Sequence, residues 1–254
     1  MTHGPRIQKS TTFDQGITLN HSKIFNADGT AIYSDYDDTP ITLNYSTIKS
    51  SNGYGIYSSG ENSNIIINNS TISENVDAGI YSIGNYDTVR VNHSTISGNS
   101  GYGIYTGSSH TPIILNNVNI SNNDNTGVYG GSSSSPITLD SVLVEENGDH
   151  GIYGSSSASP ITITNSIIRG NDNSGIYQAS SGSTIYIDQS LLSDNGQYGV
   201  YSQNNSIVIS YSTFINNYNQ GLYLSNSSYS VTSNNSIFSN NQSYSEMNHV
   251  YAPG

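Results

Sequence analysis

Apolar and polar positions along this chain follow a pattern that repeats every 24 residues. Each unit contains two aliphatic residues that flank one other residue, as in Ile41-Thr42-Leu43, and a single aliphatic or Phe residue seven positions after the first. Alternation with period two over three to four residues predicts short β-strands, because helices need longer segments with a period of 3.6.

A third element, Gly-Ile-Tyr, keeps the same phase. It begins with Ala31-Ile32-Tyr33 and ends with Gly221-Leu222-Tyr223, and each step is 24 residues except the last, which is 22 (221 − 199). The Gly of the element recurs at Gly55, Gly79, Gly103, Gly127, Gly151, Gly175 and Gly199. Each unit therefore contains three β segments separated by turns rich in Gly, Ser, Asn and Asp.

A unit of three short strands cannot bury its apolar side alone, but stacked units can. The repeat predicts an all-β parallel β-helix, or β-solenoid, of about ten coils with three parallel sheets. At about 4.8 Å per coil the rod would be about 45–50 Å long. We expect a single domain over residues 1–254, with an N-terminal edge or first coil at 1–16, regular repeats at 17–241 and a partial coil at 242–254.

Asparagine occupies one turn position in eight consecutive units. These residues are Asn75, Asn99, Asn123, Asn147, Asn171, Asn195, Asn217 and Asn241. A turn residue in the left-handed region favours Gly or Asn, so we expect these residues to adopt that conformation. Their stacked side chains are also expected to form a structural hydrogen-bonded ladder along the rod.

The Tyr of the Gly-Ile-Tyr element is predicted to face outward, because the preceding aliphatic residue faces the core. The column comprises Tyr33, Tyr57, Tyr81, Tyr105, Tyr129, Tyr153, Tyr177, Tyr201 and Tyr223. One interpretation is an exposed aromatic ladder that only stabilises its sheet. The other is a contact surface for a second rod or for sugar rings, with Tyr57 to Tyr201 as the candidate binding residues.

Composition excludes several functions. The net charge is −12 with only six Lys and Arg residues, which argues against nucleic-acid binding and against binding to an anionic membrane. The chain contains no cysteine, so disulfides and thiolate metal sites are excluded. No apolar run approaches the length of a membrane span, and residues 1–13 lack the apolar core of a signal peptide.

The aliphatic triplet, the turn Asn and the Gly-Ile opening together resemble the right-handed parallel β-helix repeats of the pectate-lyase-like superfamily. The resemblance covers residues 17–241. It implies the right-handed fold but is weak evidence for a function, because the superfamily includes polysaccharide lyases and hydrolases, phage tailspikes, and surface or adhesin repeats.

Candidate chemistry is sparse. Asp35, Asp37, Asp38 and Glu61 form an acidic group that is a weak Ca²⁺ candidate, with a solvated acidic turn as the alternative. We expect Glu61 to lie directly above Asp37. The polygalacturonase-type motifs of the superfamily appear only as fragments, namely Asp37-Asp38, Asp149-His150-Gly151 and residues 6–9.

Other polar residues are also predicted to be non-catalytic. Arg90 and Arg169 are expected to have no acidic cluster beside them. His150 is interpreted as a turn substitution, and His21 and His93 as solvent-facing residues.

Functional sites usually interrupt a repeat, and this repeat is almost unbroken. We therefore predict no catalytic residues, no cofactor, and an extracellular or cell-surface structural or adhesive solenoid. Its predicted partner is itself, in a homo-oligomer or filament formed end to end or laterally. The alternatives are a polysaccharide-active β-helix enzyme, such as a lyase, hydrolase or tailspike-like depolymerase, and a glycan-binding module that uses the Tyr column.

Overall fold

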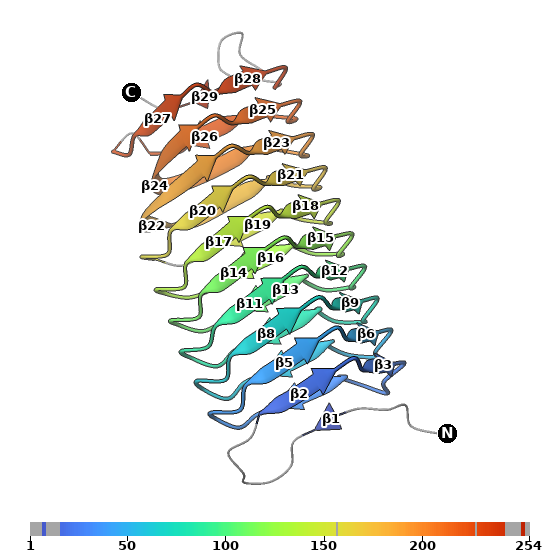
Figure 1. Cartoon of the computed structure of the whole chain (residues 1–254). Coiled ribbons are helices and arrows are strands. Elements are labelled where there is room, and N and C mark those ends of the chain that lie inside the picture. Colours follow the sequence, from blue (N-terminus) through green and yellow to red (C-terminus); the bar gives the residue numbers. More distant parts are fainter. Residues whose placement is uncertain (1–6, 9–15, 156, 227, 242–249, 252–254) are drawn as a thin grey trace.

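The computed structural model describes residues 7–8, 16–155, 157–226, 228–241 and 250–251. Each coil contains three strands joined by three corners, and successive coils stack with parallel pairing (Figure 1). The predicted all-β parallel solenoid is confirmed.

The strands form three stacks that run along the rod. The first stack contains the paired aliphatic residues: β2 (Ile17–Asn20), β5 (Ile41–Asn44), β8 (Ile65–Asn68), β11 (Val89–Asn92), β14 (Ile113–Asn116), β17 (Ile137–Asp140), β20 (Ile161–Thr164) and β27 (Val231–Asn234). The second stack contains the single aliphatic residues: β3 (Lys23–Phe25), β6 (Thr47–Lys49), β9 (Thr71–Ser73), β12 (Thr95–Ser97), β15 (Asn119–Ser121), β18 (Leu143–Glu145), β21 (Ile167–Arg169), β23 (Leu191–Ser193), β25 (Thr213–Ile215) and β28 (Ile237–Ser239). The third stack contains the Tyr column: β1 (Ile7–Gln8), β4 (Ile32–Ser34), β7 (Ile56–Ser58), β10 (Ile80–Ser82), β13 (Ile104–Thr106), β16 (Val128–Gly130), β19 (Ile152–Gly154), β26 (Leu222–Leu224) and β29 (Val250–Tyr251).

Two long strands connect the third stack to the first. β22 (Ile176–Asp188) and β24 (Val200–Ser210) continue around a corner that is a turn in the other coils, so these two stacks form one hydrogen-bonded sheet. The two-residue deletion falls at this corner, where the register between the two strands shifts twice. The predicted three sheets are therefore three stacks of strands arranged as a 19-stranded and a 10-stranded sheet.

The 24-residue period places each residue over its equivalent in the next coil. Ile80 pairs with Ile104 and Tyr81 with Tyr105, and the same offset holds in the other stacks. The inward aliphatic residues, such as Ile104, Leu115 and Ile120, are almost completely buried and form one continuous core.

The left-handed residues lie next to the predicted positions. Positive φ falls on the residue before each ladder asparagine, for example Glu74 (φ 55°) before Asn75 and Asn122 (φ 55°) before Asn123. The expectation that the ladder asparagines themselves are left-handed was wrong. The left-handed residue turns the chain at the corner, so the following asparagine can point inward and bond to the neighbouring coils.

The asparagine ladder itself forms. All eight side chains are buried, and the Nδ2 of each from Asn75 to Asn217 donates to the Oδ1 of the next at 2.8–3.0 Å. Each Oδ1 from Asn99 onward also accepts the backbone N–H of the preceding ladder residue. These bonds satisfy polar groups that would otherwise be costly to bury.

The same ladder explains the glycine of the Gly-Ile-Tyr element. A Cβ at Gly103 would lie 3.0 Å from the Nδ2 of Asn123 and 2.5 Å from the carbonyl oxygen of Gly127. Ala31 occupies the equivalent position in the first coil, where the ladder residue of the next coil is the smaller Ser51.

The stacking extends to both ends of the described chain. β1 pairs with β4, which places Ile7 beside Ile32, and β29 pairs with β26, which places Tyr251 beside Tyr223. The predictions that the segment around Ile7 joins a first coil and that Val250 and Tyr251 form an edge are confirmed. The rest of 1–16 and of 242–254 lies outside the described residues, apart from Gly16.

Candidate functional site

The nine tyrosines of the column stack ring on ring. Neighbouring ring centroids lie 4.5–5.7 Å apart with interplanar angles of 3–22°. Every ring is half-buried rather than exposed, because its faces contact the rings above and below it. Burial raises the pKa of the Tyr105 hydroxyl above its ordinary value. The stacking favours the structural interpretation, since the ring faces needed for sugar stacking are occupied.

A second aromatic column packs against the first, and the sequence reasoning missed it. Its members occur in every second coil: Tyr54, Tyr102, His150 and Tyr198. Each contacts two rings of the Tyr column; Tyr102, for example, lies 5.0 Å from Tyr105 and 5.4 Å from Tyr129. The coils between carry Ala78, Thr126, Ser174 and Gln220 at this position. This 48-residue alternation was readable in the sequence, since each large ring needs a non-aromatic neighbour above it.

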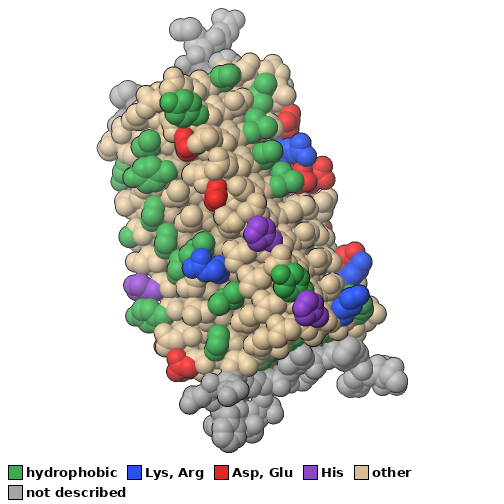
Figure 2. All heavy atoms as spheres, viewed as in Figure 1, with side chains coloured by type: hydrophobic (Ala, Val, Ile, Leu, Met, Phe, Trp, Pro, Cys, Tyr) green, Lys and Arg blue, Asp and Glu red, His purple; other side chains and the backbone are tan. Residues whose placement is uncertain are grey.

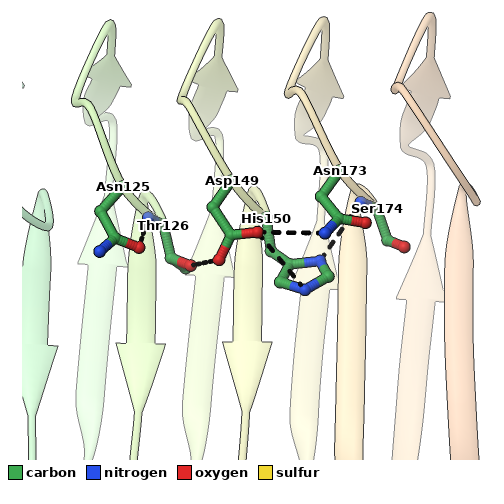
Figure 3. A network of polar contacts seen from close by, with 6 residues as sticks. All are labelled: Asn125, Thr126, Asp149, His150, Asn173 and Ser174. Carbon is green, nitrogen blue, oxygen red and sulfur yellow. Dashed lines mark hydrogen bonds and ion pairs between the residues drawn. The ribbon is translucent and has the colours of Figure 1, made fainter.

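His150 takes the place of a tyrosine in this second column. Its ring is buried and lies 5.4 Å from Tyr153 and 4.7 Å from Tyr177. Nδ1 accepts the backbone N–H of Ser174 at 3.2 Å, so the neutral ring carries its proton on Nε2, which lies 3.7 Å from Oδ1 of Asp149 (Figure 3). Burial lowers the pKa of His150, and this effect outweighs the opposing effect of Asp149.

Asp149 is held on both of its oxygens. Oδ2 accepts the hydroxyl of Thr126 at 2.9 Å, and Oδ1 accepts Nδ2 of Asn173 at 3.1 Å (Figure 3). The network therefore fixes a neutral imidazole within an aromatic wall. This geometry stabilises the corner and, because the ring is buried, does not present a base to a substrate.

The acidic residues of the first coils are only partly brought together. Glu61 lies directly above Asp37 as expected, and its backbone N–H donates to Oδ1 of Asp37 at 2.8 Å. Asp38 is left-handed at its corner (φ 53°), and Asp35 interacts with the Tyr33 hydroxyl. Among the described residues, no group of three or more acidic or histidine side chains is arranged to hold a metal ion. The arrangement agrees with a solvated acidic turn.

Asp87 is the acidic residue with the most altered environment. It is fully buried, and its carboxylate accepts the Ser63 N–H at 2.6 Å and the Ser82 hydroxyl at 2.8 Å. Burial raises the pKa of Asp87 to about 6, because these two hydrogen bonds only partly offset the loss of solvation. The repulsion from Glu61 and Asp37 adds to the increase.

The two arginines differ. Arg169 pairs with Glu145 in the coil before it, with NH2 and Nε at 2.7 and 2.8 Å from Oε2, so the expectation that it stands apart from acidic residues was wrong. Arg90 is exposed on β11. His21 and His93 are exposed, as predicted.

Charged side chains are few and scattered over the face shown in Figure 2, which is mostly polar and uncharged. No helix that is long and apolar enough to cross a membrane occurs in the described part of the chain.

The coil geometry agrees with comparisons of the sequence. Residues 6–118 and 106–249 match the family described as "Right handed beta helix region". The chain belongs to this right-handed β-helix family. No curated protein matches the β-helix chain in sequence.

Solved structures resemble this β-helix in fold. Pectate lyase Pel9A aligns with a TM-score of 0.54 and 18% identity over 91% of this chain and 68% of its own. The A-module of the Azotobacter vinelandii mannuronan C-5 epimerase AlgE4 aligns with a TM-score of 0.53 and 14% identity over 97% and 80%. The periplasmic alginate epimerase AlgG aligns with a TM-score of 0.52 and 11% identity over 80% and 62%. At these identities the likeness establishes the fold alone.

Proposed function

We propose that this β-helix is an extracellular or cell-surface scaffold with a structural or adhesive role. The observation that carries the proposal is the continuity of its ladders. One hydrogen-bonded asparagine chain runs from Asn75 to Asn241, and one aromatic stack runs from Tyr33 to Tyr223. Such continuous ladders make a stiff rod, which suits a spacer or fibre segment better than a reaction centre.

Self-association of the rods is the assembly that we propose. β3 and β28 are the edge strands of the second stack within the described residues, and an edge strand offers unpaired backbone groups to another copy. Electron microscopy of the purified protein is expected to show rods or filaments, and light scattering is expected to give a mass that grows with concentration. A monodisperse monomer at high concentration would argue against the filament.

A polysaccharide-active enzyme is the second candidate. It is favoured by the fold of the neighbours, which are a pectate lyase and two enzymes named for mannuronan or alginate epimerisation. This alternative predicts activity on a neutral or acidic polysaccharide that is lost in Asp37→Asn or Asp38→Asn. Absence of product from a broad polysaccharide panel, measured by reducing-end release, unsaturated-product absorbance and proton NMR, would leave the scaffold as the better proposal.

A further inference from the structure

A column of serine hydroxyls follows the corner between the first and second stacks, and it is interrupted in the middle of the rod. In most coils the backbone N–H of this corner residue donates to the serine hydroxyl of the next coil, as Ser46 does to Ser70 and Ser70 does to Ser94, both at 3.0 Å. The next two positions are Val118 and Val142, whose side chains have no hydroxyl and turn into the core. The N–H groups of Ser94 and Val118 therefore lack the acceptor that the other coils supply.

The surface is hollowed at this interruption. A groove of about 440 Å³ crosses three coils and is lined by His93, Ser94, Thr95, Asn117, Val118, Asn119, Ser141 and Leu143. Its volume lies within the range of small-molecule sites, about 300–1,000 Å³. His93, Asn117 and Ser141 are the left-handed corner residues (φ 47°, 53° and 58°), and Thr95, Asn119 and Leu143 begin strands β12, β15 and β18.

The groove also contains an acceptor that nothing satisfies. Oδ1 of Asn119 is buried and has no hydrogen-bond partner. Buried polar groups are normally paired, so an unpaired amide oxygen near two N–H groups without their ladder acceptor is unusual. A hydroxyl group is the simplest complement, because it accepts from an N–H and donates to a carbonyl oxygen at the same time.

We propose that this groove binds a short neutral oligosaccharide. Ligand hydroxyls would replace the missing serine hydroxyls at Ser94 and Val118 and would donate to Asn119, while Val118 and Leu143 contact the apolar face of a sugar ring. None of the eight lining residues is Lys, Arg, Asp or Glu, and the chain carries a net charge of −12, so an anionic sugar is disfavoured. The site is distinct from the Tyr column and does not depend on assembly of the rods.

The test uses ¹⁵N-labelled full-length protein titrated with maltotriose, cellotriose, mannotriose and chitotriose, with trigalacturonate as the anionic comparator. At least one neutral trisaccharide is expected to shift the amide signals of Ser94, Val118 and Asn119. Asn119→Leu is expected to weaken this binding about tenfold, as for the loss of one hydrogen bond to a ligand. The fold should accept this change, because Leu143 occupies the same position in the next coil.

Thr71→Leu is the matched control, since residue 71 has the same place in the repeat and lies outside the groove. It should bind as the wild type does. A second variant, Val118→Ser, restores the hydroxyl that accepts the Ser94 N–H, and it should also weaken binding. The proposal is overturned if no neutral trisaccharide shifts these amides, if Asn119→Leu and Thr71→Leu behave alike, or if trigalacturonate binds more tightly. A monomeric protein that binds the trisaccharide would contradict the filament but leave this site intact.

Discussion

The buried asparagines show how a single residue type solves a problem that each coil creates. Each corner buries backbone groups that have no partner within their own coil, and one amide side chain both accepts and donates between coils. The glycine of the Gly-Ile-Tyr element makes room for that amide. The two conserved-looking features of the repeat unit therefore depend on each other.

Asn123→Ala is expected to destabilise the protein by about 3 kcal/mol, because it leaves the Asn99 N–H and side-chain amide without their acceptor. The measurement is the urea midpoint followed by far-UV circular dichroism. Asn20→Ala is the control, since Asn20 is exposed and only accepts the Asn44 amide, and it should cost less than about 0.5 kcal/mol. Equal costs would contradict a structural role for the inner ladder.

Asp87 is expected to make stability depend on pH. Its pKa is about 6 in the folded protein and 3.8 ordinarily, so the folded state retains a proton that the unfolded chain loses. This contribution is fully present below about pH 4 and is lost as pH rises through about 6. Asp87→Asn keeps the acceptor for the Ser63 N–H and removes the charge.

The Asp87→Asn variant should be more stable than the wild type by about 2 kcal/mol at pH 7, with the difference vanishing near pH 4. Thermal melting between pH 4 and 8 measures both values. A constant difference across this range would show that ionisation of Asp87 is not the cause.

The aromatic columns belong to the scale of the strand stack. Each ring of the Tyr column is supported by its vertical neighbours, and each ring of the second column supports two of them. The contacts join consecutive coils along one side of the rod. Their energy therefore resists bending and fraying rather than closing a single coil.

Tyr105→Ala removes a ring that contacts Tyr81, Tyr102 and Tyr129. The expected loss is about 2–3 kcal/mol, from buried apolar area and ring stacking. Tyr211→Ala is the comparison, because that ring is 65% exposed, and it should be almost neutral in the same urea titration. A neutral Tyr105→Ala would mean that the column does not stabilise the rod.

His150→Tyr restores the aromatic residue that the second column has in Tyr102 and Tyr198. Burial places the pKa of His150 below its ordinary 6.5, so the unfolded chain binds the proton first as pH falls. The histidine's contribution is present above about pH 6.5 and is lost below it. The variant should lack this loss, although Asp149, Tyr153 and Tyr177 remain beside the site. Identical melting curves of the two proteins between pH 5 and 7.5 would rule the effect out.

The whole molecule behaves as a one-dimensional stack in which each coil contacts its two neighbours. Deletion of residues 152–175 removes one complete unit of 24 residues (175 − 152 + 1) and joins Gly151 to Ile176. The shortened chain is expected to fold with the same β-type circular dichroism spectrum and a lower melting temperature. Deletion of residues 152–163 should abolish cooperative melting, because half a unit places polar corners over apolar strands.

Repeat arithmetic alone predicted the coils, the inward aliphatic residues and the pairing of Asp37 with Glu61, because a fixed period puts each residue above its equivalent. It could not predict which corner residue takes a positive φ, since Glu74 and Asn75 differ by one place in a turn that the period does not describe. The burial of Asp87 and of His150 was also beyond it. Both depend on which way a corner turns a side chain, and that direction is set by the backbone.

The sequence by itself determined the solenoid and its register, and the interruption at Val118 and Val142 was visible in it. Only the tertiary structure decided that this interruption opens a groove and that the Tyr faces are closed. The physical reason is that both outcomes depend on packing between neighbouring coils. Valine side chains turned into the core leave the N–H groups of Ser94 and Val118 without a hydroxyl, whereas tyrosines about 5 Å apart cover one another.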